Sequence, residues 1–311
     1  MIVVKAPWSE RNGRFSAVKL VVFLALFAPG LWIGYEWATD MLAPKPVTEA
    51  LHQTGQWAVR LILLSLLVTP LRRVAQWGKL INVRRMIGVA AFVYALAHFT
   101  IYVVLDQKLA LLHVTSEIVL RFYLTIGFVA LLGLTALAAT STDAMIKRLG
   151  GRLWNRLHKL VYLIAALAIF HFYLQSKADV SEPVLMMGLY FILMIYRLLQ
   201  KARLPAWSIV VGSALLAPIA TAVLEATWYA VVRHINFWMV LDANIDFDND
   251  FRPSMYVAAA GLALIVVHVV RNVDLKRLSA IFASAKQKGR DVADAGRLLP
   301  AEGSGTADRH G

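Results

Sequence analysis

Three histidines in apolar surroundings are the residues best suited to carry chemistry in this sequence. His98 lies in the run RRMIGVAAFVYALAHFTIYVVL, and the run HKLVYLIAALAIFHFYL begins with His158 and contains His171. An ionisable side chain is costly inside a bilayer, so it usually faces the protein interior and has a function there. Imidazole nitrogen is a common axial ligand of haem iron. Two such helices side by side would be able to hold a haem within a membrane.

The composition predicts that these runs are membrane helices. Of the 311 residues, 59% are hydrophobic, and the mean hydropathy is +0.63. Several apolar runs approach the roughly 20 residues that a helix needs to cross a bilayer. The net charge of +13 comes from Lys and Arg residues that gather at the ends of these runs, which indicates membrane topology and argues against nucleic-acid binding. The expected fold is all-α, a polytopic transmembrane helix bundle.

The alternation of basic and non-basic loops predicts the topology. It gives eight helices with both termini in the cytoplasm. The predicted helices cover roughly residues 20–38, 57–71, 86–105, 122–140, 160–174, 184–199, 207–232 and 255–270. The predicted segments are a cytoplasmic N-terminal segment (1–19), a six-helix haem-binding core (20–200), two additional helices with an acidic external loop (201–272) and a cytoplasmic, partly disordered tail (273–311).

The predicted topology places two of the histidines at the same depth. His98 follows Arg84, at the cytoplasmic border, by 14 residues, and His171 follows His158, also at that border, by 13 residues. A helix rises about 1.5 Å per residue, so both His98 and His171 lie about 20 Å from the cytoplasmic face. We therefore expect them to be the two axial ligands of one haem iron. The alternative is that each histidine is a hydrogen-bonded packing residue.

His158 has no evident histidine partner. On one ideal helix it would be rotated from His171 by roughly 140°, so two stacked haems would need a distorted helix. The residue at its depth on the other helix is Arg84, which cannot ligate haem iron. Arg84 and Arg85 could instead clamp an anion, such as a haem propionate or a flavin phosphate. Equally, these two arginines could simply mark the cytoplasmic border.

Two absences narrow the function. The sequence contains no cysteine, so any haem must be held non-covalently, as haem b. These 311 residues also contain no G-x-G-x-x-G motif and no P-loop, so we expect the reductant to bind elsewhere. Iron with two histidine ligands has no open coordination position, which favours electron transfer over oxygen activation. The chain is therefore not expected to be an enzyme on its own.

From about His52 to Leu199 the chain resembles the MsrQ family, the haem-binding membrane subunits of the bacterial periplasmic methionine sulfoxide reductase system. That family belongs to the ferric-reductase-like transmembrane group, which includes the NADPH oxidases. The resemblance lies in HQTGQWAVRLILLSLLVTPLRR, in RRMIGVAAFVYALAHFTIY and in LTALAATSTDAMIKRLGGRLWNRLHKLVYLIAALAIFHFY. It covers about half of the chain.

This resemblance implies a set of residue roles. His98, His158 and His171 would be the haem-binding histidines. The NADPH oxidases hold two stacked haems with two histidines on each of two helices, spaced 14 and 13 residues apart. Here Arg84 stands where the fourth histidine would be, so the second haem, the one nearer the cytoplasmic face, lacks one of its ligands. The FMN attributed to the family would fit near that inner end, with His158 beside it.

The resemblance also implies a function in the bacterial inner membrane. Electrons from a cytoplasmic flavin reductase or the quinone pool would pass through flavin and haem b. Their acceptor would be a separate periplasmic molybdopterin enzyme, which forms a heterodimer with the chain and repairs oxidised methionine in proteins.

Two other functions remain as alternatives. A proton-coupled transporter with a histidine relay would contain no haem. It would ordinarily have helices interrupted by Gly or Pro at corresponding positions in the two halves of the chain, and the sequence shows no such pair. A self-contained metalloreductase would need a nucleotide-binding domain.

Overall fold

The computed structural model describes residues 8–10, 13–176, 179–246 and 250–272. The predicted tail, 273–311, lies outside the described residues, as do 1–7 and 11–12 of the N-terminal segment and 247–249 of the acidic loop. Apart from an isolated β-bridge between Ser9 and Phe15, the regular structure of the described residues is helical. Residues up to His268 belong to one compact unit.

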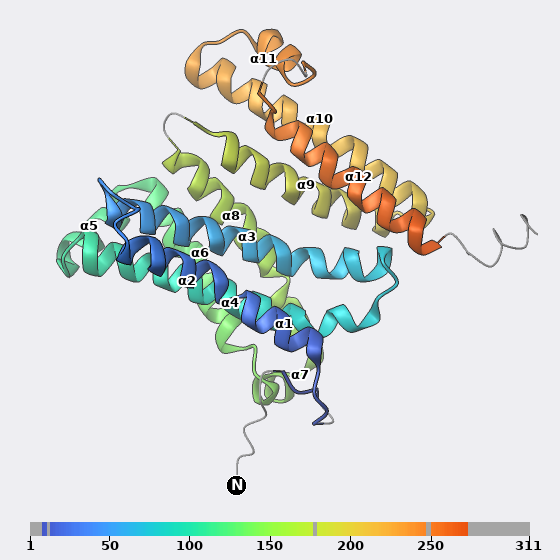
Figure 1. Ribbon diagram of the computed structural model, residues 1–311, viewed down its shortest axis with the longest axis horizontal. Coiled ribbons are helices and arrows are strands. Elements are labelled where there is room, and N and C mark those ends of the chain that lie inside the picture. The colour runs from blue at the N-terminus through green and yellow to red at the C-terminus, as the bar shows by residue number, and fades with distance from the viewer. Residues whose placement is uncertain (1–7, 11–12, 177–178, 247–249, 273–311) are drawn as a thin grey trace, which may run out of the picture. The chain divides into compact units, whose positions relative to one another are not determined.

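The long helices correspond to the predicted spans (Figure 1). The first six spans are formed by α1 (Ala17–Ala25) with α2 (Ala28–Ala38), α3 (Pro46–Val74), α4 (Ile81–Ile101) with the π-helix η2 (Tyr102–Asp106), α6 (Phe122–Ala139), α8 (Leu160–Gln175) and α9 (Ser181–Lys201). The last two are α10 (Ala206–Arg233) and α12 (Pro253–Asn272). Shorter helices occupy the connections: η1 (Gly78–Leu80), α5 (Leu111–Leu120), α7 (Asp143–His158) and α11 (Phe237–Ala243).

These helices make the chain a polytopic helical membrane protein. Within the described residues, seven spans are long and apolar enough to cross a bilayer, and α7 with α8 make an eighth if the bent pair counts as one span. The predicted helix bundle is therefore confirmed. The prediction missed the short helices α5, α7 and α11, because hydropathy detects only segments long enough to span.

The first predicted span was found but is interrupted, and the predicted start of the second span was wrong. The first span breaks between α1 and α2, because Pro29 has no N–H to donate to the carbonyl of Ala25. Helix α3 begins at Pro46, well before the predicted residue 57, so most of the predicted loop at 40–56 is helical. Its start has the usual signals, a proline in the first helical positions and Glu49 in the first turn. Hydropathy missed them because this part of α3 is polar.

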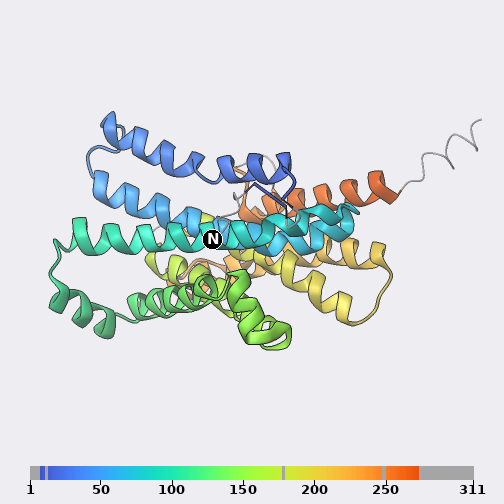
Figure 2. The ribbon, with the colours of Figure 1, turned by 90° about the horizontal axis from the view of Figure 1, so that it is seen from below.

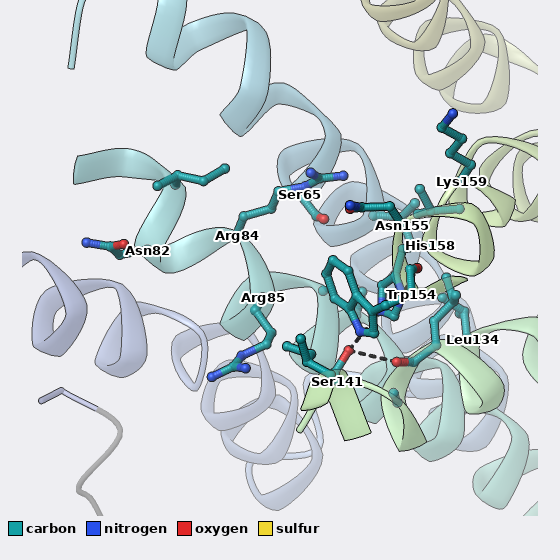
Figure 3. Close-up of a pocket in the computed structure, with 18 of the residues that line it drawn as sticks. Ser65, Asn82, Arg84, Arg85, Leu134, Ser141, Trp154, Asn155, His158 and Lys159 are labelled. Carbon is teal, nitrogen blue, oxygen red and sulfur yellow. Dashed lines mark hydrogen bonds between the residues drawn. The ribbon is translucent and has the colours of Figure 1, made fainter. Parts of the chain in front are cut away.

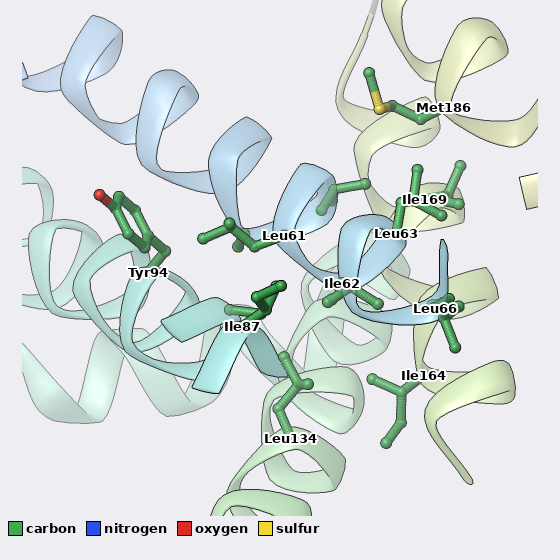
Figure 4. Close-up of a cluster of buried hydrophobic side chains, with 14 of the residues drawn as sticks. Leu61, Ile62, Leu63, Leu66, Ile87, Tyr94, Leu134, Ile164, Ile169 and Met186 are labelled. Carbon is green, nitrogen blue, oxygen red and sulfur yellow. The ribbon is translucent and has the colours of Figure 1, made fainter. Parts of the chain in front are cut away.

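Helix α3 lies at the centre of the core. It packs against α4, α8 and α9, and Figure 2 shows the same helices from a second direction. Leu66 of α3 and Ile169 of α8 are completely buried, and Ile87 of α4 and Leu134 of α6 belong to the same apolar cluster (Figure 4). Lipid tails are as apolar as these side chains, so the cluster stabilises the bundle by close packing.

Two arginines join α3 to α9. Arg60 pairs with Glu182 at 2.6 Å and lies over the ring of Trp57 at 5.1 Å. Arg197 donates to the carbonyl of Leu66 at 2.6 Å. That carbonyl would ordinarily accept from residue 70, but Pro70 has no N–H. Arg197 therefore satisfies a backbone acceptor that the proline leaves open.

Helices α10 and α12 pack beside α9 through Ile192, Ala217 and Val257. A polar group is buried among them, because the carboxylate of Glu225 accepts hydrogen bonds from Asn244 at 3.0 Å and from Arg252 at 3.2 Å. A buried carboxylate with two such donors connects α10, α11 and the start of α12.

Candidate functional site

His98 and His171 meet in the structure, as their matched depths predict. His98 lies on α4 and His171 on α8, and the centroids of their imidazole rings are 6.4 Å apart with the ring planes at 82°. Both side chains are half-buried. Nδ1 of His98 lies 2.8 Å from the carbonyl oxygen of Leu51, and Nδ1 of His171 lies 2.8 Å from that of Tyr123.

These hydrogen bonds determine the tautomer of each ring. A carbonyl oxygen only accepts, so Nδ1 must carry the proton in both histidines. Nε2 of each neutral ring is then left with a lone pair, which is the form that binds a metal ion. Metal-binding histidines usually donate their other N–H to a carbonyl or carboxylate in this way.

The spacing of the two rings fits one metal ion between them. With about 2.0–2.1 Å from metal to imidazole nitrogen and about 1.1 Å from nitrogen to ring centroid, two ligands on opposite sides have centroids roughly 6.3 Å apart. The observed separation is 6.4 Å. No cluster of three or more His, Asp and Glu side chains suited to a metal occurs in the described part of the chain, so this pair is a candidate for haem iron, whose ring supplies the other ligands.

A large cavity lies near the start of α4, at the end of that helix away from His98, and it is lined by residues of α3, α4, α6, α7 and α8 (Figure 3). Its volume is ≈ 1140 Å³. The side chains that line it include Ser65, Asn82, Arg84, Arg85, Ser141, Trp154, Asn155, His158, Lys159 and Tyr162. Glu10 and Lys19 line it as well, so four Lys and Arg side chains share the cavity with one carboxylate, and Trp154 and Tyr162 add aromatic rings.

His158 has a different environment from the other two histidines. Its ring stacks on Trp154 with centroids 3.8 Å apart, Nδ1 lies 3.1 Å from the carbonyl oxygen of Trp154, and Nε2 lies 3.3 Å from Oγ of Ser141. Both ring nitrogens are thus engaged with the protein. His158 is also the last residue of α7, and a 40° bend separates α7 from α8, so it does not begin the helix that carries His171 as predicted.

Arg84 and Arg85 line the same cavity but differ in their partners. Arg85 forms an exposed ion pair with Asp143. No carboxylate pairs with Arg84 among the residues described, and its side chain extends past Ser65 on the cavity side, whereas that of Arg85 points away (Figure 3). An arginine that faces a cavity and forms no ion pair with a carboxylate among the described residues is suited to bind an anion.

Several structural features around the three histidines were not predicted from the sequence. They are the carbonyls of Leu51 and Tyr123, the ring of Trp154 beneath His158, and Tyr162, whose ring lies 5.2 Å from the guanidinium of Arg197. Backbone carbonyls have no sequence signature. Trp154 is four residues before His158, a spacing that places two residues on one helical face, so this pair did leave a weak signal.

Comparison with known proteins agrees with this architecture. Residues 54–169 match a family described as the ferric reductase like transmembrane component. A protein-methionine-sulfoxide reductase heme-binding subunit MsrQ of Xanthomonas campestris is 41% identical over 199 residues, covering 62% of this chain and 91% of the relative. The subunit of the same name from Agrobacterium fabrum is 45% identical over 174 residues, covering 56% of this chain and 80% of the relative. No solved structure matches the chain significantly.

The identity extends over most of the length of these relatives. The ferric-reductase-like match contains His98 and ends two residues before His171. This chain therefore belongs to the MsrQ family.

Proposed function

We propose that the chain is a membrane electron-transfer subunit that holds one haem b between His98 and His171. The observation that carries the proposal is the facing pair of rings, 6.4 Å apart, with each Nδ1 bonded to a carbonyl and each Nε2 available. The name of the relatives, heme-binding subunits, points to the same cofactor. Haem b held by two histidines would supply a one-electron centre with both axial positions filled.

The inner cavity would hold a flavin, proposed as FMN by likeness to the family. Arg84, which pairs with no carboxylate in the described part of the chain, offers a cation for a phosphate, with Arg85 and Lys159 nearby on the cavity wall. Trp154 and Tyr162 give aromatic surface within the same cavity. Since His158 is hydrogen-bonded through both nitrogens, we assign it to the wall of this cavity and not to a second haem.

The direction of electron flow follows from the proposed topology. The basic ends of the spans would face the cytoplasm of a bacterial cell and lie in its inner membrane, with both termini inside. A cytoplasmic flavin reductase or a quinol would donate at the inner cavity. A periplasmic molybdopterin-containing methionine sulfoxide reductase, bound as a heterodimer, would accept electrons at the end that contains His98 and His171.

A reduced-minus-oxidised visible spectrum of the purified protein tests the proposal. We expect a b-type α-band in the unaltered protein and its loss in His98→Ala. Gln53→Ala, on the polar part of α3, is a control that leaves both histidines in place and should keep the band. Protein purified with adequate haem supply but lacking a Soret band would exclude this function, and a pH-dependent flux through liposomes would then favour a transporter.

A further inference from the structure

The environments of His98 and His171 share a feature beyond the hydrogen bond to a carbonyl. Each ring lies directly against a glycine of the neighbouring helix, Gly55 of α3 for His98 and Gly127 of α6 for His171. A Cβ added to Gly55 would lie 2.9 Å from Nδ1 of His98. A Cβ added to Gly127 would lie 2.8 Å from both Nδ1 and Cε1 of His171. Neither position tolerates a side chain without displacing the ring.

The two arrangements have the same helical register. Leu51, whose carbonyl bonds His98, precedes Gly55 by four residues, and Tyr123, whose carbonyl bonds His171, precedes Gly127 by four. Four residues is about one helical turn, so in each case the glycine lies directly above the carbonyl. The missing Cβ lets the ring approach the helix backbone and reach that oxygen. Alanine has the higher helix propensity, so helix formation does not explain either glycine.

We propose that Gly55 and Gly127 are positioning residues that fix the orientation and the donor strength of the two haem ligands. This inference rests on the proposed ligation of haem by His98 and His171. Each glycine and the carbonyl one turn before it form a seat for one imidazole ring. The two seats together hold the ring planes at 82° to each other.

The seats have two physical consequences. A carbonyl that accepts from Nδ1 makes the imidazole a stronger donor at Nε2, which favours ferric over ferrous iron and lowers the midpoint potential. The fixed ring orientation sets the anisotropy of low-spin ferric haem, because perpendicular imidazole planes give an EPR signal with a large maximum g-value. A glycine that acted only in helix packing would affect neither property.

The test compares glycine variants of the full-length, haem-loaded protein. Gly55→Ala and Gly127→Ala should each displace one ring and lengthen its bond to the carbonyl. We expect the midpoint potential to become more positive and the maximum g-value to fall or the signal to broaden. The unaltered protein should show the large-g signal, and a signal typical of parallel imidazole planes in it would overturn the proposal even if both variants failed to fold.

Two other glycines provide matched controls. Gly133 lies on α6 like Gly127, and a Cβ there would come within 2.8 Å of Ile164 of α8 and not of a histidine. Gly133→Ala therefore crowds the same helix pair without touching the seat. Gly34→Ala, on α2, adds a Cβ into open space. Both should keep the potential and the EPR signal of the unaltered protein.

The outcomes separate this inference from the proposed function. If His98→Ala and His171→Ala retain haem, the ligand assignment fails. If they lose haem while Gly55→Ala and Gly127→Ala keep the original potential and g-values, the ligands are right and the seats are wrong. If Gly133→Ala shifts the potential as far as Gly127→Ala does, helix packing explains the effect and the proposal is overturned.

Discussion

At one end of the helix core, His98 and His171 each use one ring nitrogen for a backbone carbonyl and keep the other available. At the opposite end, His158 has both nitrogens engaged and its face covered by Trp154. The three histidines look alike in the sequence, since all are next to or within apolar runs. The partner of the second ring nitrogen, and not the residue type or its depth, therefore distinguishes a candidate metal ligand from a residue of the cavity wall.

The two ends of the helix core also differ in how tightly their side chains pack. The pair His98 and His171 is closely packed, with each ring against a glycine. The end with His158 opens into a cavity of ≈ 1140 Å³ with Arg84 on its wall. A pair of facing rings suits a flat cofactor held by coordination, whereas a cationic cavity suits an anionic cofactor held by charge and hydrogen bonds.

The largest difference between the two ends should appear when one histidine is removed from each. His171→Ala should abolish haem binding, because one axial ligand is lost. His158→Ala should leave the haem content close to that of the unaltered protein, because the outer pair stays intact. Haem content per polypeptide, measured as the pyridine complex, checks both. Equal losses in the two variants would mean that His158 also ligates iron and that the ends do not differ as described.

Arg84→Ala should weaken flavin binding while leaving haem content unchanged. A hydrogen bond to a charged group contributes about 1.5–3 kcal/mol, so its loss should raise the dissociation constant of FMN by roughly 10- to 100-fold. Fluorescence titration of the flavin-free protein with FMN measures it. Arg85→Ala is the control, since Arg85 pairs with Asp143, and we expect a clearly smaller change. Similar effects in the two variants would contradict the assignment of Arg84 as the anion clamp.

Arg197→Ala should lower stability and change flavin affinity less than Arg84→Ala does. The substitution leaves the carbonyl of Leu66 without its donor in α3, where Pro70 cannot replace it. An unsatisfied buried acceptor costs about 1–3 kcal/mol. Thermal unfolding in detergent compares this variant with the unaltered protein, and FMN titration separates it from Arg84→Ala. An unchanged midpoint temperature would show that the carbonyl is satisfied in another way.

The smallest effect is expected from Asp143→Asn. The Asp143–Arg85 pair is exposed, with 64% and 44% of the two side chains accessible, and exposed pairs contribute about 0–1 kcal/mol. Haem content, FMN affinity and unfolding temperature should all stay close to those of the unaltered protein. A large loss of FMN affinity would mean that the pair positions the cavity wall, and it would move the anion site toward Arg85.

Much of the architecture could be predicted because hydropathy and charge are local properties of the chain. Long apolar runs with basic ends predict the spans and the alternating direction in which they cross the membrane. The 14- and 13-residue spacings predict that His98 and His171 share a depth. Both the start of α3 at Pro46 and the break before Pro29 carry a proline signal. The start was missed because the first turns of α3 are polar, and the break because hydropathy does not register a missing N–H. The 40° bend after His158 has no comparable signal.

Hydropathy, charge and histidine spacing are enough to predict a multi-span helical membrane protein, a haem held without cysteine, and which histidines share a depth. Which ring nitrogens are free follows from the tertiary structure instead. It depends on which backbone carbonyl each ring meets on a neighbouring helix, 47 residues away for His98 and 48 for His171, and on the glycine beside that carbonyl. A helix has the same backbone groups everywhere along its length, so only the packing of one helix against another selects the carbonyl that orients a ligand.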